Sequence, residues 1–141
     1  QRGGCRIAGF ASRSGDAIRV LLYAHNEGDY GSGRTASVRG RTASVRRVNP
    51  AYDVTLDLAS FPWPAAQLTE YRLDRQHNSF LALAEKCRGK KVFSKDEVAE
   101  LLRLQELAPT RQAETRAEQG KARLTLEVAN NGVTFVVLEP R

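Results

Sequence analysis

Carboxylates, two histidines and one tryptophan are the side chains of this sequence that invite a chemical interpretation. Two carboxylate pairs lie close in sequence, Glu27 with Asp29 and Asp53 with Asp57. Hydrolysis of a glycosidic bond usually needs two carboxylates, about 5 to 9.5 Å apart, on either side of the bond. Asp53 and Asp57 alternate with apolar residues, which indicates the solvent side of a strand. Glu27 and Asp29 belong to a turn-rich loop, where carboxylates are more often solvated than catalytic.

A second polar group follows the sequence Tyr71–Leu73 and contains Asp74, His77 and Asn78. From their residue types, Asp74 and Asn78 could cap a short helical turn, and His77 could bond to backbone. We favour this structural interpretation over a catalytic one. No nucleophile elbow or phosphate-binding glycine loop accompanies these residues, so the sequence indicates no catalytic residue.

The two cysteines, Cys5 and Cys87, lie far apart and show no spacing typical of metal ligands. Only His25 and His77 could add to them, so we expect neither a metal site nor a cofactor. A disulfide and two buried thiols are both open alternatives, depending on whether the chain is exported. The compartment is open for the same reason: extracellular, lysosomal or periplasmic if exported, cytoplasmic otherwise.

The composition is that of one globular domain. Hydrophobic residues make up 41% and charged residues 27% of the 141 positions. The longest apolar run, Phe135–Leu138, is too short to cross a bilayer, so we expect no membrane partner. The chain starts with Gln1 and contains no Met, and we therefore expect a fragment of a larger protein.

Alternating apolar residues predict most of the strands. Residues 51–59 alternate strictly, and residues 17–25 read as a strand buried on both sides. Residues 123–128 and 133–138 flank Asn130–Gly132, a sequence that predicts a tight hairpin turn. Weaker strand signals cover 6–12 and 67–73.

One clear helix interrupts the strands. Ser94 and Glu97 have the spacing of a capping box, which predicts an inserted helix over 94–108. A shorter helical turn is expected over 80–87, and residues 109–120 read as a polar connector. The resulting fold class is mainly β: one domain over 1–141, an antiparallel β-sandwich of immunoglobulin or fibronectin type with one or two short helices.

An exact seven-residue duplication, GRTASVR, occupies 33–39 and 40–46. Five arginines fall between Arg34 and Arg47, and the whole chain carries a net charge of +6. This stretch could bind a polyanion, or it could be a tolerated duplication in an edge loop; we favour the loop. No predicted helix carries a basic stripe with interleaved aromatics, so a nucleic-acid partner is not favoured.

From about Asp16 onward the chain resembles the C-terminal β-domain of glycoside hydrolase family 39, the family of β-xylosidases and α-L-iduronidases. Three stretches carry the resemblance: Ile18–Asn26, Tyr71–Ser79, and the closing pattern from Leu124 to Leu138. They occur in the same order as in the family. The stretch Tyr71–Ser79 differs from the family at Arg75 and Gln76, where the family usually has acidic residues. The GRTASVR duplication has no counterpart in the family.

The resemblance implies a non-catalytic accessory domain whose partner is a (β/α)₈ barrel. In the family, the catalytic glutamates lie on that barrel, one of them in an Asn-Glu-Pro motif. Here Glu139–Pro140 follows Leu138, so no catalytic residue can be transferred. The alternatives are an independent carbohydrate-binding module, for which Trp63 is the candidate platform, and an Arg-rich polyanion-binding module. The candidate barrel- or sugar-facing residues are His25, Asn26, Glu27, Asp29, Trp63, Asp74, His77 and Asn78.

Overall fold

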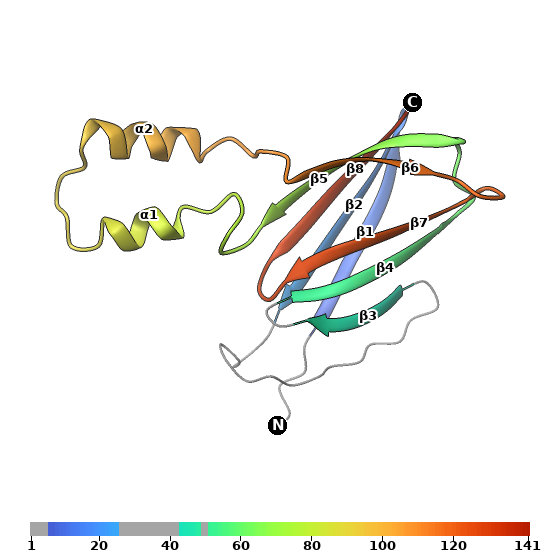
Figure 1. Ribbon diagram of the computed structural model, residues 1–141, viewed down its shortest axis with the longest axis horizontal. Coiled ribbons are helices and arrows are strands. Elements are labelled where there is room, and N and C mark those ends of the chain that lie inside the picture. Colours follow the sequence, from blue (N-terminus) through green and yellow to red (C-terminus); the bar gives the residue numbers. More distant parts are fainter. Residues whose placement is uncertain (1–5, 26–42, 49–50) are drawn as a thin grey trace, which may run out of the picture.

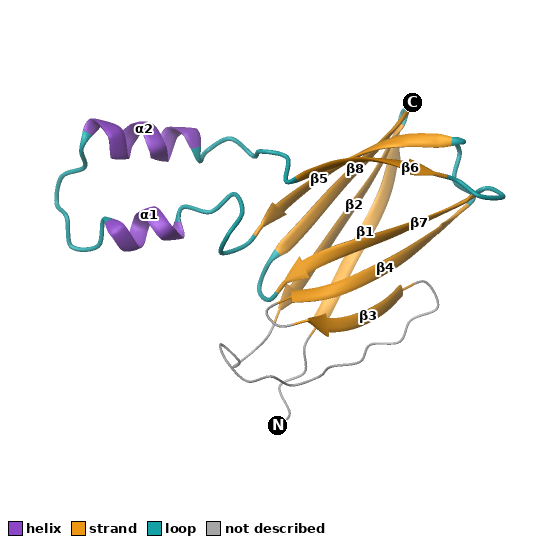
Figure 2. Ribbon diagram, in the orientation of Figure 1, coloured by secondary structure: helices purple, strands orange, loops and turns teal. Residues whose placement is uncertain are grey.

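The computed structural model of the protein describes residues 6–25, 43–48 and 51–141. Within these residues, eight strands form two antiparallel sheets that pack face to face (Figure 1). Two helices leave one end of this sandwich together and project away from it (Figure 2). The predicted fold class, a mainly β antiparallel sandwich with two short helices, is therefore confirmed.

The larger sheet has five strands in the order β1-β2-β8-β5-β6. Its strands are β1 (Arg6–Ser14), β2 (Ala17–His25), β8 (Val133–Pro140), β5 (Ala65–Leu73) and β6 (Arg111–Arg116). The smaller sheet has the order β3-β4-β7. Its strands are β3 (Ala43–Val48), β4 (Ala51–Ala59) and β7 (Lys121–Ala129).

The core lies between the sheets and is built by strict alternation. Strand β7 is buried at every second residue, and β8 follows the same pattern. Because successive side chains of a strand point to opposite faces, each of these strands commits one face to the core. The largest fully buried side chains are Tyr52, Val54, Leu68, Leu126, Val128, Thr134, Val136 and Leu138. Among them, the Thr134 hydroxyl donates a hydrogen bond of 2.7 Å to the backbone oxygen of Glu127 and so links the two sheets.

The predicted C-terminal hairpin is wrong in its pairing. Strands β7 and β8 follow each other around a tight turn, but β7 pairs with β4 and β8 pairs with β2 and β5. Each strand carries a full apolar face, and both faces are buried when the strands face each other across the core rather than side by side in one sheet. In the turn, Asn131 has a φ of 53°. A Cβ at Gly132 would lie only 3.0 Å from that of Ala129, so the tight turn favours glycine there.

The connector predicted over 109–120 is also corrected. Residues Arg111–Arg116 form strand β6, which pairs with β5 from Glu70 to Ala65. The tract is polar because β6 is an edge strand with little buried surface, and pairing satisfies the backbone of β5. Helix α2 (Lys95–Arg103) begins at the predicted capping box but ends before 108, and helix α1 (Leu81–Lys86) forms the shorter helical turn.

Candidate functional site

The first group of candidate residues, around the end of β2, lies only in part within the residues that the structure describes. Asn26, Glu27 and Asp29 lie outside the described residues, as does most of the GRTASVR duplication. His25 is the last residue of β2 and is exposed. The structure thus leaves this half of the predicted site as a prediction.

Asp74 organises the loop that follows β5. Its carboxylate accepts hydrogen bonds from the backbone nitrogens of Gln76 and His77, at 2.8 and 2.9 Å, and from His77 Nδ1 at 2.9 Å. Burial alone would raise the pKa of Asp74, but these hydrogen bonds outweigh it and hold the pKa below its usual value. Asp74 and His77 are therefore partners of each other, a contact that the sequence analysis did not predict, and Asp74 also binds the loop backbone.

Asn78 does not cap helix α1, in contrast to the expectation from its position. Its amide nitrogen donates to the backbone oxygens of Arg72 and Ala108, at 2.8 and 2.9 Å. Its side-chain oxygen accepts from the nitrogen of Ala108 at 2.9 Å. Asn78 adopts a φ of 49°, a left-handed conformation that asparagine tolerates better than most residues. It therefore ties the chain leaving β5 to the chain entering β6.

Trp63 packs at the edge of the core. Its ring meets Phe61 edge to face, with centroids 5.4 Å apart, and the Arg13 guanidinium lies 6.0 Å from the ring centroid. Trp63 is half-buried and touches the hydrophobic core cluster. The indole therefore closes the sandwich edge, and only part of its ring remains exposed.

The surface that the sequence analysis missed is the outer face of the five-stranded sheet. Register places Phe10, Leu21, Phe135 and Tyr71 opposite one another in a row across β1, β2, β8 and β5. Residues directly opposite in antiparallel strands share a face, so this row is continuous across four strands. The Tyr71 and Phe135 rings lie 6.0 Å apart, and Phe10 is 64% exposed.

A second apolar row runs beside the first. It contains Tyr23, Val133 and Leu73, again in register across β2, β8 and β5. Tyr23 and Leu73 are both exposed. The signal for this face was present in β2 and β8, which carry apolar residues on both sides, although Arg19 and His25 also lie on the outer side of β2. The sequence over 17–25 predicts a strand buried on both sides, whereas the structure buries one side only.

The outer face of the three-stranded sheet is polar instead. Asp57 and Arg123 lie opposite each other on β4 and β7, with Oδ1 and Nε 2.6 Å apart. The hydrogen bond from Arg123 lowers the pKa of Asp57. Asp53 projects from the same exposed face as Asp57, so this carboxylate pair lies on an open sheet surface. The arrangement matches a solvated strand face and not a pair of carboxylates on either side of a bound substrate.

Over residues 6–25, 43–48 and 51–141, no cluster of three or more His, Cys, Asp or Glu side chains could hold a metal ion. Cys87 is buried, and Cys5 lies outside these ranges. No helix in the same ranges has both the length and the hydropathy to span a membrane.

No protein-family profile and no curated protein matches the sequence. Solved structures do match the fold. The family 39 glycoside hydrolase from Xanthomonas axonopodis pv. citri superimposes with a TM-score of 0.67 at 16% identity, over 94% of this chain and 26% of the enzyme. The fold is that of one segment of a family 39 glycoside hydrolase.

Two further enzymes agree. A monomeric β-xylosidase from Caulobacter crescentus CB15 has a TM-score of 0.65 at 18% identity, over 94% of this chain and 26% of the enzyme. The bacterial orthologue of human α-L-iduronidase has a TM-score of 0.58 at 14% identity, over 99% and 22%. The chain thus spans about a quarter of the length of the enzymes it matches. The resemblance to family 39 is confirmed at the level of the fold.

Proposed function

We propose that the chain is a non-catalytic accessory β-sandwich domain of a glycoside hydrolase, which packs beside a catalytic (β/α)₈ barrel and supports it. The fold supports this because β-xylosidase and α-L-iduronidase structures contain it as about a quarter of their length. The carboxylates Asp53 and Asp57 support the non-catalytic role, since they lie on an open sheet face with Asp57 engaged by Arg123.

The observation that carries the proposal is the apolar outer face of the five-stranded sheet. Phe10, Leu21, Phe135 and Tyr71 form one row in register across four strands, with a second apolar row beside it. Contiguous apolar surface of this kind is uncommon on isolated soluble domains and typically marks a contact with another protein surface. A catalytic domain that covers this face would remove the two rows from water, which stabilises the assembly.

An independent carbohydrate-binding module is the competing function, because aromatic rings on a flat sheet can stack on pyranose rings. The composition of the face argues against it. Sugar sites place hydrogen-bonding groups around their rings. Of the side chains beside Phe135 on this face, Leu21, Val133 and Val137 are aliphatic and only Tyr71 carries a hydrogen-bonding group, while Arg19 and Thr69 lie one step further along the strands, in register with Val137. Calorimetry with xylo-oligosaccharides and anionic glycans, at low and moderate salt, separates the alternatives: saturable binding to a neutral sugar would replace the accessory role.

The direct test isolates the native molecule that contains this chain. An antibody against the 141-residue chain is used to purify it from the cells that express it, followed by mass spectrometry and assays with aryl β-xylosides and aryl α-L-iduronides. We expect glycosidase activity and a (β/α)₈ catalytic domain, either on the same polypeptide or tightly bound to it. A free 141-residue protein without any glycoside hydrolase would overturn the proposal.

The sheet face is then tested by two lysine substitutions in that native molecule. Phe135→Lys places a charge in the centre of the apolar row, and Thr125→Lys places the same charge on the exposed outer face of the small sheet. An unpaired charge in a contact is costly, so we expect Phe135→Lys to shorten the half-life of the activity on heating about tenfold. Thr125→Lys is expected to leave it unchanged. Equal half-lives for the two variants would exclude the five-stranded face as the contact.

A further inference from the structure

The two helices and their connections form a helical arm, defined here as residues 78–108. The arm leaves the sandwich after β5 and returns to it before β6, so both of its ends lie at the same end of the five-stranded sheet (Figure 2). It carries most of the large apolar side chains that the described chain exposes. These are Phe80, Val92, Phe93, Val98, Leu102 and Leu107.

Helix α2 carries apolar residues on two adjoining sides, and only one of these sides faces helix α1. Leu101 faces α1 and, with Phe80, Leu83 and Phe93, lines a hollow of about 280 Å³ between the helices. Val98 and Leu102 lie one helical turn apart on α2 but remain exposed, Leu102 by 58%. An isolated two-helix arm gains little by keeping such residues in water, so their exposure points to a contact outside the arm.

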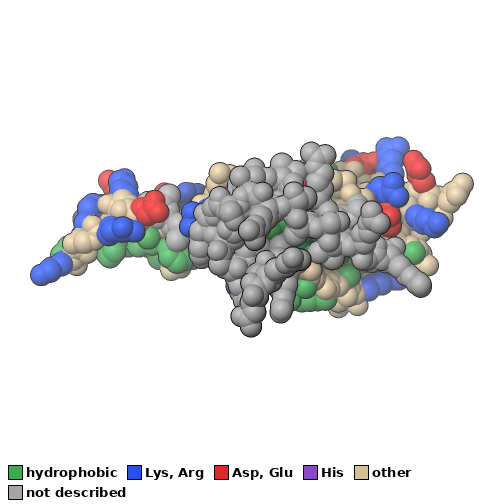
Figure 3. All heavy atoms as spheres, turned by 90° about the horizontal axis from the view of Figure 1, so that it is seen from below, with side chains coloured by type: hydrophobic (Ala, Val, Ile, Leu, Met, Phe, Trp, Pro, Cys, Tyr) green, Lys and Arg blue, Asp and Glu red, His purple; other side chains and the backbone are tan. Residues whose placement is uncertain are grey.

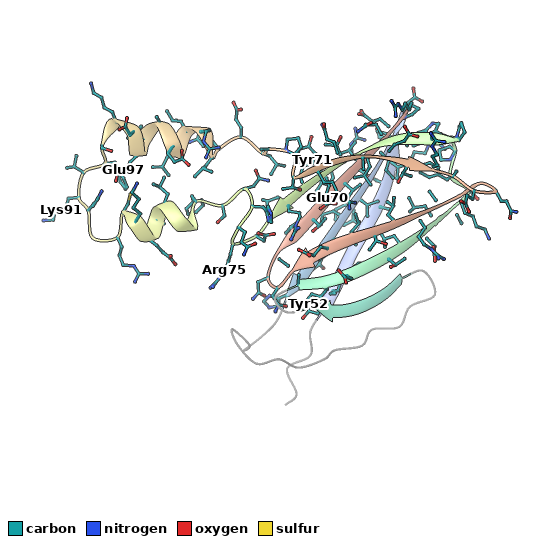
Figure 4. The ribbon with its side chains drawn as sticks, in the orientation of Figure 1. Tyr52, Glu70, Tyr71, Arg75, Lys91 and Glu97 are labelled. Carbon is teal, nitrogen blue, oxygen red and sulfur yellow. The ribbon has the colours of Figure 1, made fainter. Side chains whose placement is uncertain are left out.

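The inner side of the arm is fixed by polar contacts. Glu97 is buried on the side of α2 that faces α1, and its carboxylate pairs with Lys90 and accepts from the nitrogen of Ser94 at 2.9 Å (Figure 4). These bonds close the end of the arm that is far from the sandwich. They hold the loop between the helices against the first turn of α2, the turn that also carries Val98.

The base of the arm is also held firmly. Asn78 joins the backbones of Arg72 and Ala108, as described above. Thr110 donates from its nitrogen and its hydroxyl to the backbone oxygen of Glu70, at 2.7 and 3.0 Å. Arg72 forms ion pairs with Asp74 and with Glu127 of β7, so both sheets contribute to the base. A surface that is ordered in advance loses little entropy on binding.

Apolar side chains are visible on the same side of the arm and of the sandwich in one view (Figure 3). Figure 3 shows hydrophobic side chains along the lower edge of the arm, with Lys and Arg side chains above them, and further hydrophobic side chains on the lower side of the sandwich. Among the described strand residues, the large apolar side chains with the greatest exposure are Phe10, Tyr23 and Leu73, all on the outer face of the five-stranded sheet. One partner can therefore contact the sheet face and the arm together.

We propose that the helical arm is a second contact for the same catalytic domain, with Val98 and Leu102 as its anchors and the hollow beside Phe93 as a socket for an apolar side chain. This inference rests on the proposed accessory function. Two observations favour the catalytic domain as the partner. The arm leaves the five-stranded sheet just after Leu73, an exposed residue of the apolar outer face, and the matched enzymes carry about three quarters of their chain beyond the matched segment. The sheet face would contribute most of the buried contact area. The arm would fix the orientation of the sandwich relative to the catalytic domain.

The test compares three variants of the native molecule: Leu102→Lys on the apolar side of α2, Ala99→Lys at an exposed position one residue after Val98, and Phe135→Lys on the sheet. The readouts are hydrogen exchange of residues 78–108 and the half-life of glycosidase activity on heating. We expect Leu102→Lys to speed exchange along the arm and shorten the half-life about tenfold, with less than a twofold change for Ala99→Lys.

The possible outcomes distinguish the proposed arm contact from the proposed accessory function. If Phe135→Lys shortens the half-life and Leu102→Lys does not, the arm contact is overturned and the accessory function stands. If no variant has an effect, docking through both surfaces is overturned. An arm-dependent dimer in light scattering, abolished by Leu102→Lys and without exchange protection from the catalytic domain, would assign the arm to a second copy of this chain and overturn the choice of partner.

Discussion

The two outer faces of this sandwich cover the same core but differ in the side chains at their centres. The face of β4 and β7 presents Asp53, Asp57 and Arg123, with charges paired across the strands. The face of β1, β2, β8 and β5 presents two rows of apolar side chains, among them Phe10 and Phe135. A sheet face that contacts only water is usually polar. The apolar face therefore indicates a contact with another protein surface.

The comparison also explains why the two sheets read differently in sequence. Strand β4 alternates, because one of its sides is buried and the other is wet. The middles of β2 and β8 carry apolar residues on both sides, with Arg19, His25 and Glu139 towards the strand ends of the outer side. Apolar residues on both sides usually belong to strands covered on both faces. In the isolated chain only one of those faces is covered. The pattern is accounted for if a partner covers the other.

The largest expected effect is on the free energy of unfolding, and it compares a substitution in the core with one on the apolar outer face. Leu126 is 1% exposed between the sheets, and Leu126→Ala is expected to reduce the free energy of unfolding by about 2 to 5 kcal/mol. Phe10→Ser on the outer face is expected to change it by about 0.5 kcal/mol or less, because Phe10 is already mostly in water. Urea titration of the two variants measures both values. A loss at Phe10 as large as that at Leu126 would show that the outer row stabilises the fold itself.

A smaller effect is expected from acid, which should weaken the helical arm before it weakens the two sheets. The hydrogen bond from Lys90, and then that from the Ser94 nitrogen, lowers the pKa of Glu97 from 4.5 to about 2. A lowered carboxyl pKa means that the native state favours the ionised form, so its stabilisation is present above about pH 4.5 and is lost as the pH falls towards 2. Hydrogen exchange should show the arm losing protection within this window.

The control for this prediction is Glu97→Gln, which cannot ionise. Its arm should already exchange faster at neutral pH and should show a flatter response to acid than the native arm. Protection of β7 and β8 serves as the internal reference in the same experiment. If those strands lose protection in step with the arm, the transition is global and does not report on Glu97.

The smallest effect concerns the polar face. Asp57→Asn removes the ion pair with Arg123, which lies on the surface with both side chains largely exposed. Surface ion pairs contribute little and are screened by salt, so a slight loss of stability at low salt should vanish at high salt. Urea midpoints at two salt concentrations test this. A large, salt-independent loss would mean that the polar face stabilises the fold more than an open sheet surface can.

Local signals were sufficient where one strand or one helix end decides the structure. The alternation over 51–59 predicted β4 with its bounds, and Ser94 with Glu97 predicted the start of α2. Both depend on neighbours a few residues away, which a sequence displays directly. In the loop after β5, Asp74 accepts from backbone nitrogens two and three residues further on, which is the kind of local bond that its residue type suggests. Asn78 instead bonds to Ala108, a partner 30 residues away that no local rule indicates.

What the sequence determined by itself is the class of the fold, because period-two burial and turn residues act over short distances. The tertiary structure decided how those strands pair: β7 and β8 are neighbours in sequence but lie in different sheets, and the polar tract after α2 completes the larger sheet as β6. It also decided which apolar surface is left open. Pairing and exposure depend on contacts between distant segments. The apolar residues on the second side of β2 and β8 are visible in the sequence, but neither their exposure nor the direction of the arm could be read from the order of residues alone.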